Sequence, residues 1–158
     1  MSTKWGTDHN VHVRTSRVDF QSLNYLVNKS MKLIVICGSR RFKPEMRELA
    51  NKLKDAGVVV YEPYLHSGQE EWANLSDAYK KFVALGLTHD HFYKIQMADV
   101  VFLYNKDGYS GNSTTLEIGY AIAKGKPIYA LASDEELCRH VLVREIINKP
   151  EDLIKKLR

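Results

Sequence analysis

Short apolar runs that alternate with helical segments constrain the fold of this chain more than any other feature. Four runs occur, "KLIVIC" (32–37), "VVVYEP" (58–63), "VVFLY" (100–104) and "KPIYALA" (126–132). Continuous apolar runs of this length, ended by Gly, Pro or Asn, are typical of buried parallel strands. The alternation predicts an α/β domain, a flavodoxin- or Rossmann-like three-layer sandwich of about five mainly parallel strands with helices on both faces.

Apolar residues at helical spacing predict the helices between these runs. Pro residues in first turns and Gly residues at the ends mark several boundaries, and Gly125 is placed just after one helix. A fifth strand is possible over 141–147. The predicted helices cover 44–56, 71–97 with a break near "LGLTHD" (85–90), 114–124, 134–140 and 149–157.

The length of 158 residues and the 44% hydrophobic content suit one domain with a sizeable core. We expect the domain to span residues 31–158 and the polar residues 1–30 to form an N-terminal extension of unknown role. No apolar run approaches the roughly 18 residues of a membrane span, and the N-terminus lacks a signal-peptide core. With only two cysteines, Cys37 and Cys138, the composition favours the reducing cytoplasm.

The formal net charge of +4 is spread along the chain, and no Lys/Arg block exceeds a pair. This pattern does not indicate binding to a nucleic-acid polymer or to a membrane. A few local cations can still bind a small anionic ligand.

Two loops follow predicted strands at the sheet edge where α/β proteins bind ligands. In the first, "CGSRRFKP", Gly38 permits close backbone approach, and Ser39, Arg40 and Arg41 offer donors for a phosphate or sugar. Backbone N–H groups at the start of the following helix are further donors for such a ligand. The alternative is a simple turn with two solvated arginines.

The second loop leads into "TTLE", in which Thr114 and Glu117 fit a capping box. Gly108 and Gly111 in this loop allow close backbone approach. Capping is one interpretation of Glu117. The other is chemical, because a carboxylate in the first helical turn would point to the crevice and be kept ionised by the helix dipole. Such a carboxylate can attack the anomeric carbon of a sugar.

The stretch "ADVVFLYNKDGYSGNSTTLEIGYAIAKGKPI" resembles the nucleoside 2-deoxyribosyltransferase family and the related 2′-deoxynucleoside 5′-phosphate N-hydrolases. An apolar strand, a Gly/Ser loop, a Glu-Ile-Gly helix start and "GKP" occur in the family's order. "ICGSRRF" and "HFYKIQMADVV" also fit, so the resemblance spans residues 32–131.

The resemblance implies roles for individual residues. Glu117 matches the nucleophilic glutamate of the family, and Asn112 and Ser113 fall where the deoxyribose or 5′-phosphate is contacted. Gly38 and Ser39 match the loop that lines the sugar and base pocket. The implied mechanism requires no metal and no cofactor.

The chain departs from the family pattern at two aspartate positions. The transferases carry an aspartate six residues before the glutamate, where this chain has Gly111. The second aspartate lies on the helix before the third strand, near Asp90 or His91. The acid set of the transferases is therefore incomplete in this chain. Gly, Asn and Ser in the loop suit a neutral or phosphorylated ligand better.

Several other side chains are weaker candidates. Tyr109 could cover the pocket as a lid, and Tyr64 and His66 could stack on a base. His91 is a candidate for substrate binding, although a surface or half-buried position is the simpler expectation. His89 and His91 do not form a metal pair, because positions i and i+2 of a helix face different ways.

These observations give one hypothesis and one alternative. The hypothesis is cleavage or transfer at the N-glycosidic bond of a (deoxy)nucleoside or its 5′-monophosphate through Glu117. The alternative is a sensor domain of the same fold that binds a nucleotide-derived ligand without turnover. The resemblance also implies a homodimer or larger homo-oligomer.

Overall fold

A computed structural model describes residues 32–63 and 69–158. Its sheet has five strands, all parallel, in the order β2-β1-β3-β4-β5. This arrangement confirms the predicted flavodoxin-like α/β class. The expected extension at residues 1–30, together with Tyr64 and His66, lies outside the described residues. The strands are β1 (Ile34–Gly38), β2 (Val60–Tyr61), β3 (Val100–Tyr104), β4 (Ile128–Ala130) and β5 (Glu145–Ile146).

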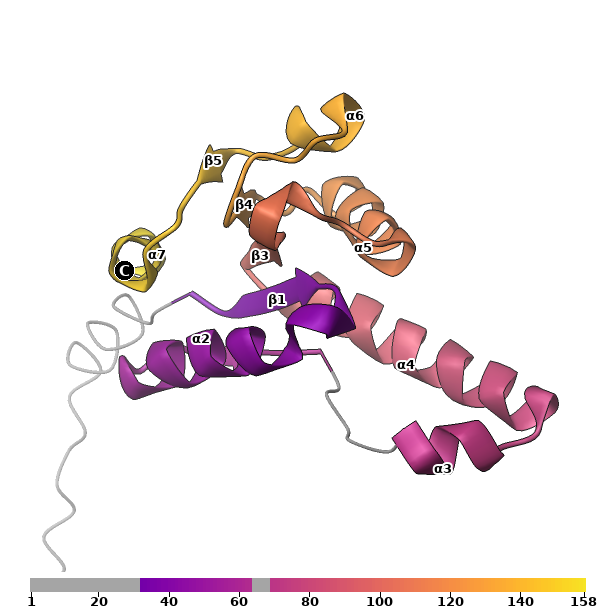
Figure 1. Ribbon diagram of the computed structural model, residues 1–158. Helices are drawn as coiled ribbons and strands as arrows, with labels where there is room; N and C mark the ends of the chain where they lie inside the picture. Colours follow the sequence, from indigo (N-terminus) through magenta and orange to yellow (C-terminus); the bar gives the residue numbers. More distant parts are fainter. Residues whose placement is uncertain (1–31, 64–68) are drawn as a thin grey trace, which may run out of the picture. The chain divides into compact units, whose positions relative to one another are not determined.

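Helices cover both faces of the sheet, with α2 and α7 on one face and α4 and α5 on the other (Figure 1). Within the described residues, no helix combines the length and the apolar content needed to cross a membrane. The helices are η1 (Arg40–Phe42), α2 (Lys43–Asp55), α3 (Gln69–Asn74), α4 (Asp77–Met97), η2 (Lys106–Gly108), α5 (Asn112–Ala123), α6 (Leu137–His140) and α7 (Pro150–Leu157).

The side chains of β1 show why its run is apolar throughout. Ile34 and Ile36 pack in the core beneath α2 and α7, whereas Val35 and Cys37 pack in the core beneath α4 and α5. All four are fully buried. Successive side chains of a strand point to opposite faces, so a strand covered on both faces must be apolar at every position.

The strand order places a topological switch point between β1 and β3. The chain moves from β1 to β2 on one side and then returns to β3 on the other. Gly38, the last residue of β1, pairs in register with Tyr104, the last residue of β3. The loops after these strands therefore start side by side at the carboxyl edge, where open α/β sheets bind ligands.

The break predicted within the helix over 71–97 differs from the structure. The predicted break within 85–90 is wrong, because α4 runs without interruption through Gly86. The interruption lies earlier, where Ser76 caps α4 by accepting a hydrogen bond from the Tyr79 N–H at 3.3 Å.

The end of α5 confirms the role predicted for Gly125. Its φ of 66° lies in the left-handed region, its N–H donates to Ile122 O, and the Lys126 N–H donates to Ala121 O. These two bonds form a Schellman motif, which terminates the helix.

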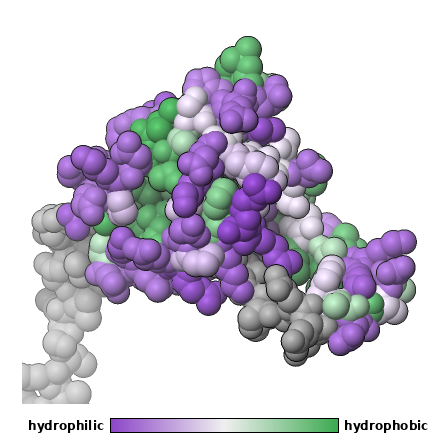
Figure 2. Space-filling model, viewed as in Figure 1, coloured by the Kyte–Doolittle hydropathy of each residue, from purple (hydrophilic) through white to green (hydrophobic). Residues whose placement is uncertain are grey.

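A cavity of about 180 Å³ lies on the face of the sheet that carries α2 and α7. Phe102, Leu131 and Ile147 contribute apolar surface, and the ion-paired Glu48 and Lys52 stand at its rim. Figure 2 shows apolar surface hollowed between hydrophilic side chains in this region. The predicted site residues lie elsewhere.

Candidate active site

A larger cavity, of about 370 Å³, opens at the switch point between β1 and β3. Its walls come from the loop after β1, from α4 and from the start of α5. Tyr109, which was predicted as a lid, is not among the lining residues. Arg41 does not line it either. Eight predicted site residues do, namely Gly38, Ser39, Arg40, His91, Gly111, Asn112, Ser113 and Glu117.

Glu117 lies further into its helix than predicted. Helix α5 begins at Asn112, with Gly111 as its N-cap, and its first turn contains no acidic residue. Thr114 is buried inside the helix and cannot cap it. The predicted capping box is therefore wrong. Three good N-cap residues in a row made the start ambiguous, and the structure places all three within the helix.

The carboxyl of Glu117 is shielded and incompletely bonded. Its side chain is 15% exposed, and its Oε2 atom has no hydrogen-bond partner among the described residues. Burial raises the pKa of Glu117 to about 8, although the hydrogen bond with the Cys37 thiol opposes the shift. The expectation of an ionised carboxylate is thus wrong for the free protein. Glu117 is one turn beyond the helix start, so burial outweighs the dipole.

His91 faces Glu117 from α4, with its Nε2 atom 3.5 Å from Oε1. It is 7% exposed, so the expectation of a surface or half-buried position is wrong. Burial, with a smaller contribution from the charge of Lys94, lowers the pKa of His91 to about 4, and the charge of Asp90 opposes the shift. The two shifts together make this a contact between a neutral imidazole and a mostly protonated carboxyl at pH 7, not an ion pair.

Cys37 completes this group from β1. Its Sγ atom lies 3.3 Å from His91 Nε2. Burial raises the pKa of its thiol, and the Glu117 carboxyl adds to the increase. The sequence predicted the burial of Cys37 correctly, but its polar contacts were missed because they join residues far apart in the chain.

Contacts between α4 and α5 position His91 against Glu117. The rings of Phe92 and Tyr120 stack with centroids 4.5 Å apart at an interplanar angle of 11°. The Tyr120 hydroxyl also donates to Gln96 Oε1 at 3.1 Å. Phe92 follows His91 directly, and Tyr120 is three residues after Glu117, so this stack fixes both helices where the two polar side chains meet.

The loop after β1 provides one cation to the cavity wall. Arg40 lines the cavity, whereas the guanidinium of Arg41 lies 3.6 Å from the ring centroid of Tyr109. Gly38 is required by packing, because a Cβ atom there would lie 2.7 Å from Met46 Sδ and 2.9 Å from Tyr104 O. This steric requirement was not anticipated.

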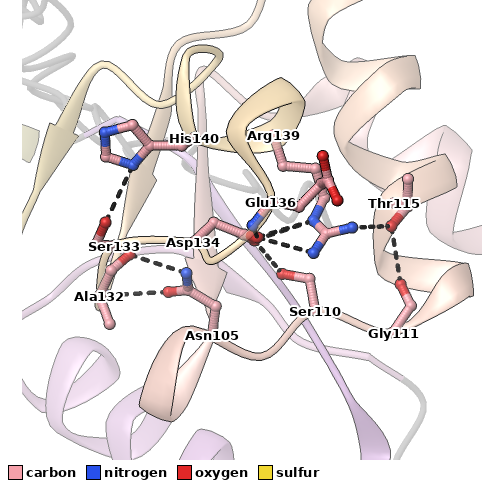
Figure 3. A network of polar contacts seen from close by, with 10 residues as sticks. All are labelled: Asn105, Ser110, Gly111, Thr115, Ala132, Ser133, Asp134, Glu136, Arg139 and His140. Atoms are coloured by element: carbon pink, nitrogen blue, oxygen red, sulfur yellow. Dashed lines mark hydrogen bonds and ion pairs between the residues drawn. The ribbon is translucent and has the colours of Figure 1, made fainter.

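A polar network anchors the loop after β3 (Figure 3). The side chain of Asn105 exchanges two 2.9 Å hydrogen bonds with the backbone of Ala132. The Ser110 hydroxyl donates to Asp134 at 2.8 Å, and Arg139 donates to both carboxylate oxygens of Asp134. The loop that leads to α5 is therefore fixed at both ends by the segment after β4.

Asp134 is ionised within this network. Burial alone would raise its pKa, but hydrogen bonds from Arg139, from the Glu136 N–H and from Ser110 lower it on balance. No side chain caps α6, and Asp134 instead bonds to a loop 24 residues earlier in the chain.

The fold and the cavity together define a flavodoxin-like α/β protein with a shielded carboxyl at its ligand-binding edge. A family model for nucleoside 2-deoxyribosyltransferase matches residues 34–153. The chain belongs to this family, as its sequence motifs predicted. A search of curated proteins found no match.

Two solved structures are similar to this chain. A 2-deoxyribosyltransferase from Bacillus psychrosaccharolyticus has 17% identity and a TM-score of 0.57, with 77% of this chain and 90% of that chain covered. A conserved protein from Enterococcus faecalis V583 has 17% identity and a TM-score of 0.56, with 81% and 98% covered. At this identity the two structures support the fold.

Proposed function

We propose that this protein cleaves the N-glycosidic bond of a (deoxy)nucleoside or its 5′-monophosphate, with Glu117 as the nucleophile. The observation that supports this most directly is the shielded carboxyl of Glu117 at the wall of the switch-point cavity, with one oxygen free of hydrogen-bond partners in the described structure. Perturbed, incompletely bonded carboxyls in cavities are typical of catalytic groups.

In the proposed reaction, Glu117 attacks the anomeric carbon as the bond to the base breaks. The base leaves with the bonding electron pair and takes up a proton, and water or a second base then displaces Glu117 from the sugar. Glu117 must first lose its own proton. His91, whose pKa is lowered to about 4, is too weak a base to take it, so the proton passes to solvent through the cavity that Glu117 lines.

The walls of the cavity suit the sugar and phosphate of such a substrate. Asn112 and Ser113 line it at the N-terminus of α5, where backbone N–H groups lack intrahelical partners. Arg40 lines it from the loop after β1 and adds a permanent positive charge. We infer that these groups bind a 5′-phosphate or the sugar hydroxyls.

Gly111 bears on the choice between hydrolysis and transfer. It lines the cavity at the position where the transferases carry an aspartate. A Cβ atom at Gly111 would have Tyr109 Oη as its nearest neighbour at 3.6 Å, so space for a side chain exists. Without that acid, protonation of the departing base falls to another group. We propose hydrolysis as the main reaction, because water as acceptor needs no recognition of a second base.

The direct test is incubation with a panel of nucleosides and 5′-monophosphates in a chelating buffer, with and without free adenine. Chromatography measures the released base. We expect release without added adenine, loss of release in Glu117→Gln, and full release in the control Glu151→Gln on α7. Release that requires adenine would identify a transferase. Activity that persists in Glu117→Gln would exclude the mechanism.

The alternative is a sensor that binds the ligand without turnover. Two features favour it, the raised pKa of Glu117, which disfavours the nucleophilic carboxylate at pH 7, and Gly111 where the transferases carry an aspartate. Calorimetric binding of a nucleotide that is recovered intact after prolonged incubation would support the sensor and contradict the proposed enzyme.

A further inference from the structure

Three potential metal ligands converge at the edge of the switch-point cavity. Cys37, His91 and Glu117 come from β1, α4 and α5, and one ligand atom from each lies within 4.8 Å of the other two. The metal pair considered from the sequence was His89 and His91, which share one helix and face different ways. Convergence of three separate elements is visible only in the folded chain.

Two of the three separations between these atoms fit a tetrahedral cation, and the third, between Cys37 Sγ and a Glu117 carboxylate oxygen, is within 4.8 Å. Zinc bonds are about 2.3 Å to sulfur, 2.0–2.1 Å to nitrogen and 2.0–2.2 Å to oxygen. At tetrahedral angles, ligand atoms are then roughly 3.3–3.6 Å apart. The distance from Cys37 Sγ to His91 Nε2 is 3.3 Å, and that from His91 Nε2 to Glu117 Oε1 is 3.5 Å.

We propose that Cys37 Sγ, His91 Nε2 and a Glu117 carboxylate oxygen form a binding site for a zinc-like divalent cation. The fourth coordination position would face the cavity, which His91 and Glu117 line. Cys37 and His91 are buried and the Glu117 side chain is 15% exposed, so all three are shielded from solvent. Exposed acidic clusters occur without metals, whereas a shielded Cys–His–Glu set is a borderline-soft donor set suited to zinc.

Binding must release protons, because the thiol and the carboxyl are protonated in the free protein and only their anions are ligands. The cation replaces the thiol proton and the carboxyl proton, and both pass to the buffer. His91 is already neutral and needs no deprotonation. Two negative ligands and one neutral ligand then balance the charge of a divalent cation.

The cation would occupy the oxygen that attacks the sugar, so it is expected to inhibit cleavage. This consequence rests on the proposed function, whereas binding of the cation does not. Chelated protein would be active and zinc-loaded protein inactive, which would make the cleavage reaction sensitive to the free zinc concentration.

Binding is tested on the full chain with Zn²⁺ and with Co²⁺ as a spectroscopic probe. Equilibrium dialysis should give one tight site per chain, and Co²⁺ should produce a thiolate-to-cobalt charge-transfer band. Cys37→Ser should abolish the band, and His91→Gln should weaken binding by at least about tenfold. The matched controls are Cys138→Ser and His89→Gln, which alter exposed residues and should leave binding unchanged.

The outcomes separate the two proposals. A band that persists in Cys37→Ser but disappears in Cys138→Ser would overturn the site, as would an absence of tight Zn²⁺ binding to the folded protein. Inhibition of base release by Zn²⁺ is measured for each variant relative to its own rate in chelating buffer. Zn²⁺ should inhibit Cys37→Ser much less than the wild type. If no chelated protein releases base, the proposed cleavage fails while the dialysis and the spectrum still decide the cation site.

Discussion

Asp134 and Glu117 are both shielded carboxyls near the loop after β3, but their surroundings are opposite. Asp134 accepts hydrogen bonds from a guanidinium, a backbone N–H and a hydroxyl, and its pKa is lowered. Glu117 contacts a neutral imidazole and a thiol, one of its oxygens has no partner in the described structure, and its pKa is raised.

The difference separates a structural carboxyl from a candidate reactive one. The bond from Ser110 ties the loop after β3 to the segment after β4, and the bonds from Arg139 and the Glu136 N–H are local, so both oxygens of Asp134 are already bonded within the protein. The shielded oxygen of Glu117 costs stability, and such a cost persists only where function requires it.

The largest expected effect is on cleavage. Glu117→Gln removes the nucleophile and keeps the shape of the side chain, so base release should fall by about 10,000-fold or more. Asp134→Asn should lower the rate by less than about tenfold, because it loosens the loop without touching the substrate. Initial rates of base release in chelating buffer measure both. Comparable losses in the two variants would contradict the assignment.

The substitution of Asp134 should have its main effect on the stability of the fold. Asp134→Asn leaves Arg139 without its carboxylate partner, and the Asp134 side chain is fully buried. We expect the free energy of unfolding to fall by about 2–3 kcal/mol in urea titrations. The control is Asp152→Asn, which breaks the exposed ion pair with Lys155 and should cost at most about 1 kcal/mol. Equal costs would show that the network is not structural.

The pH dependence of stability gives the third test, in chelated protein. The pKa of Glu117 is about 8 in the folded state, against an ordinary value of 4.5. Between these values the folded state keeps a proton that the unfolded chain has lost, so stability falls as pH rises. From pH 6.5 to 8, where His91 is neutral when folded, the fall is roughly 2 kcal/mol at most.

Glu117→Gln cannot titrate and should not show this decline. The difference in unfolding free energy between variant and wild type should therefore grow in favour of the variant from pH 6.5 to pH 8. Urea unfolding at both pH values measures it. A difference that stays constant would mean that Glu117 is ionised throughout this range.

Local sequence patterns were sufficient for the strands and for the family. Continuous apolar runs specify β1 and β3 because both faces of the sheet are covered, and the loops after them line the cavity as predicted. Gly125 was placed correctly because its left-handed φ is a local requirement. These features depend on a few neighbouring residues, which a sequence shows directly.

Contacts between distant residues could not be predicted in this way. Cys37 meets His91 across 54 residues and Ser110 meets Asp134 across 24, so no local pattern indicates either contact. Helix α5 starts two residues earlier than predicted, so Glu117 lies beyond its first turn. The predicted ionisation of Glu117 was wrong for the same reason, since the helix dipole acts only within the first turn.

The smallest expected effect comes from Gly111, the N-cap of α5. Its φ of −79° and ψ of 172° are extended, and the nearest atom to an added Cβ is 3.6 Å away, so Gly111→Asp should fit. An aspartate here can accept hydrogen bonds from N–H groups of the first turn, which should raise stability by a few tenths of a kcal/mol.

Gly111→Asp also places an acid beside the cavity, six residues before Glu117, as in the transferases. We expect an increased share of transfer to free adenine relative to hydrolysis, measured as the ratio of the two products. Gly111→Asn is the matched control, because it caps the helix equally well and supplies no acid. If both variants shift the ratio equally, capping rather than acid chemistry is responsible, and Gly111 does not decide which reaction Glu117 performs.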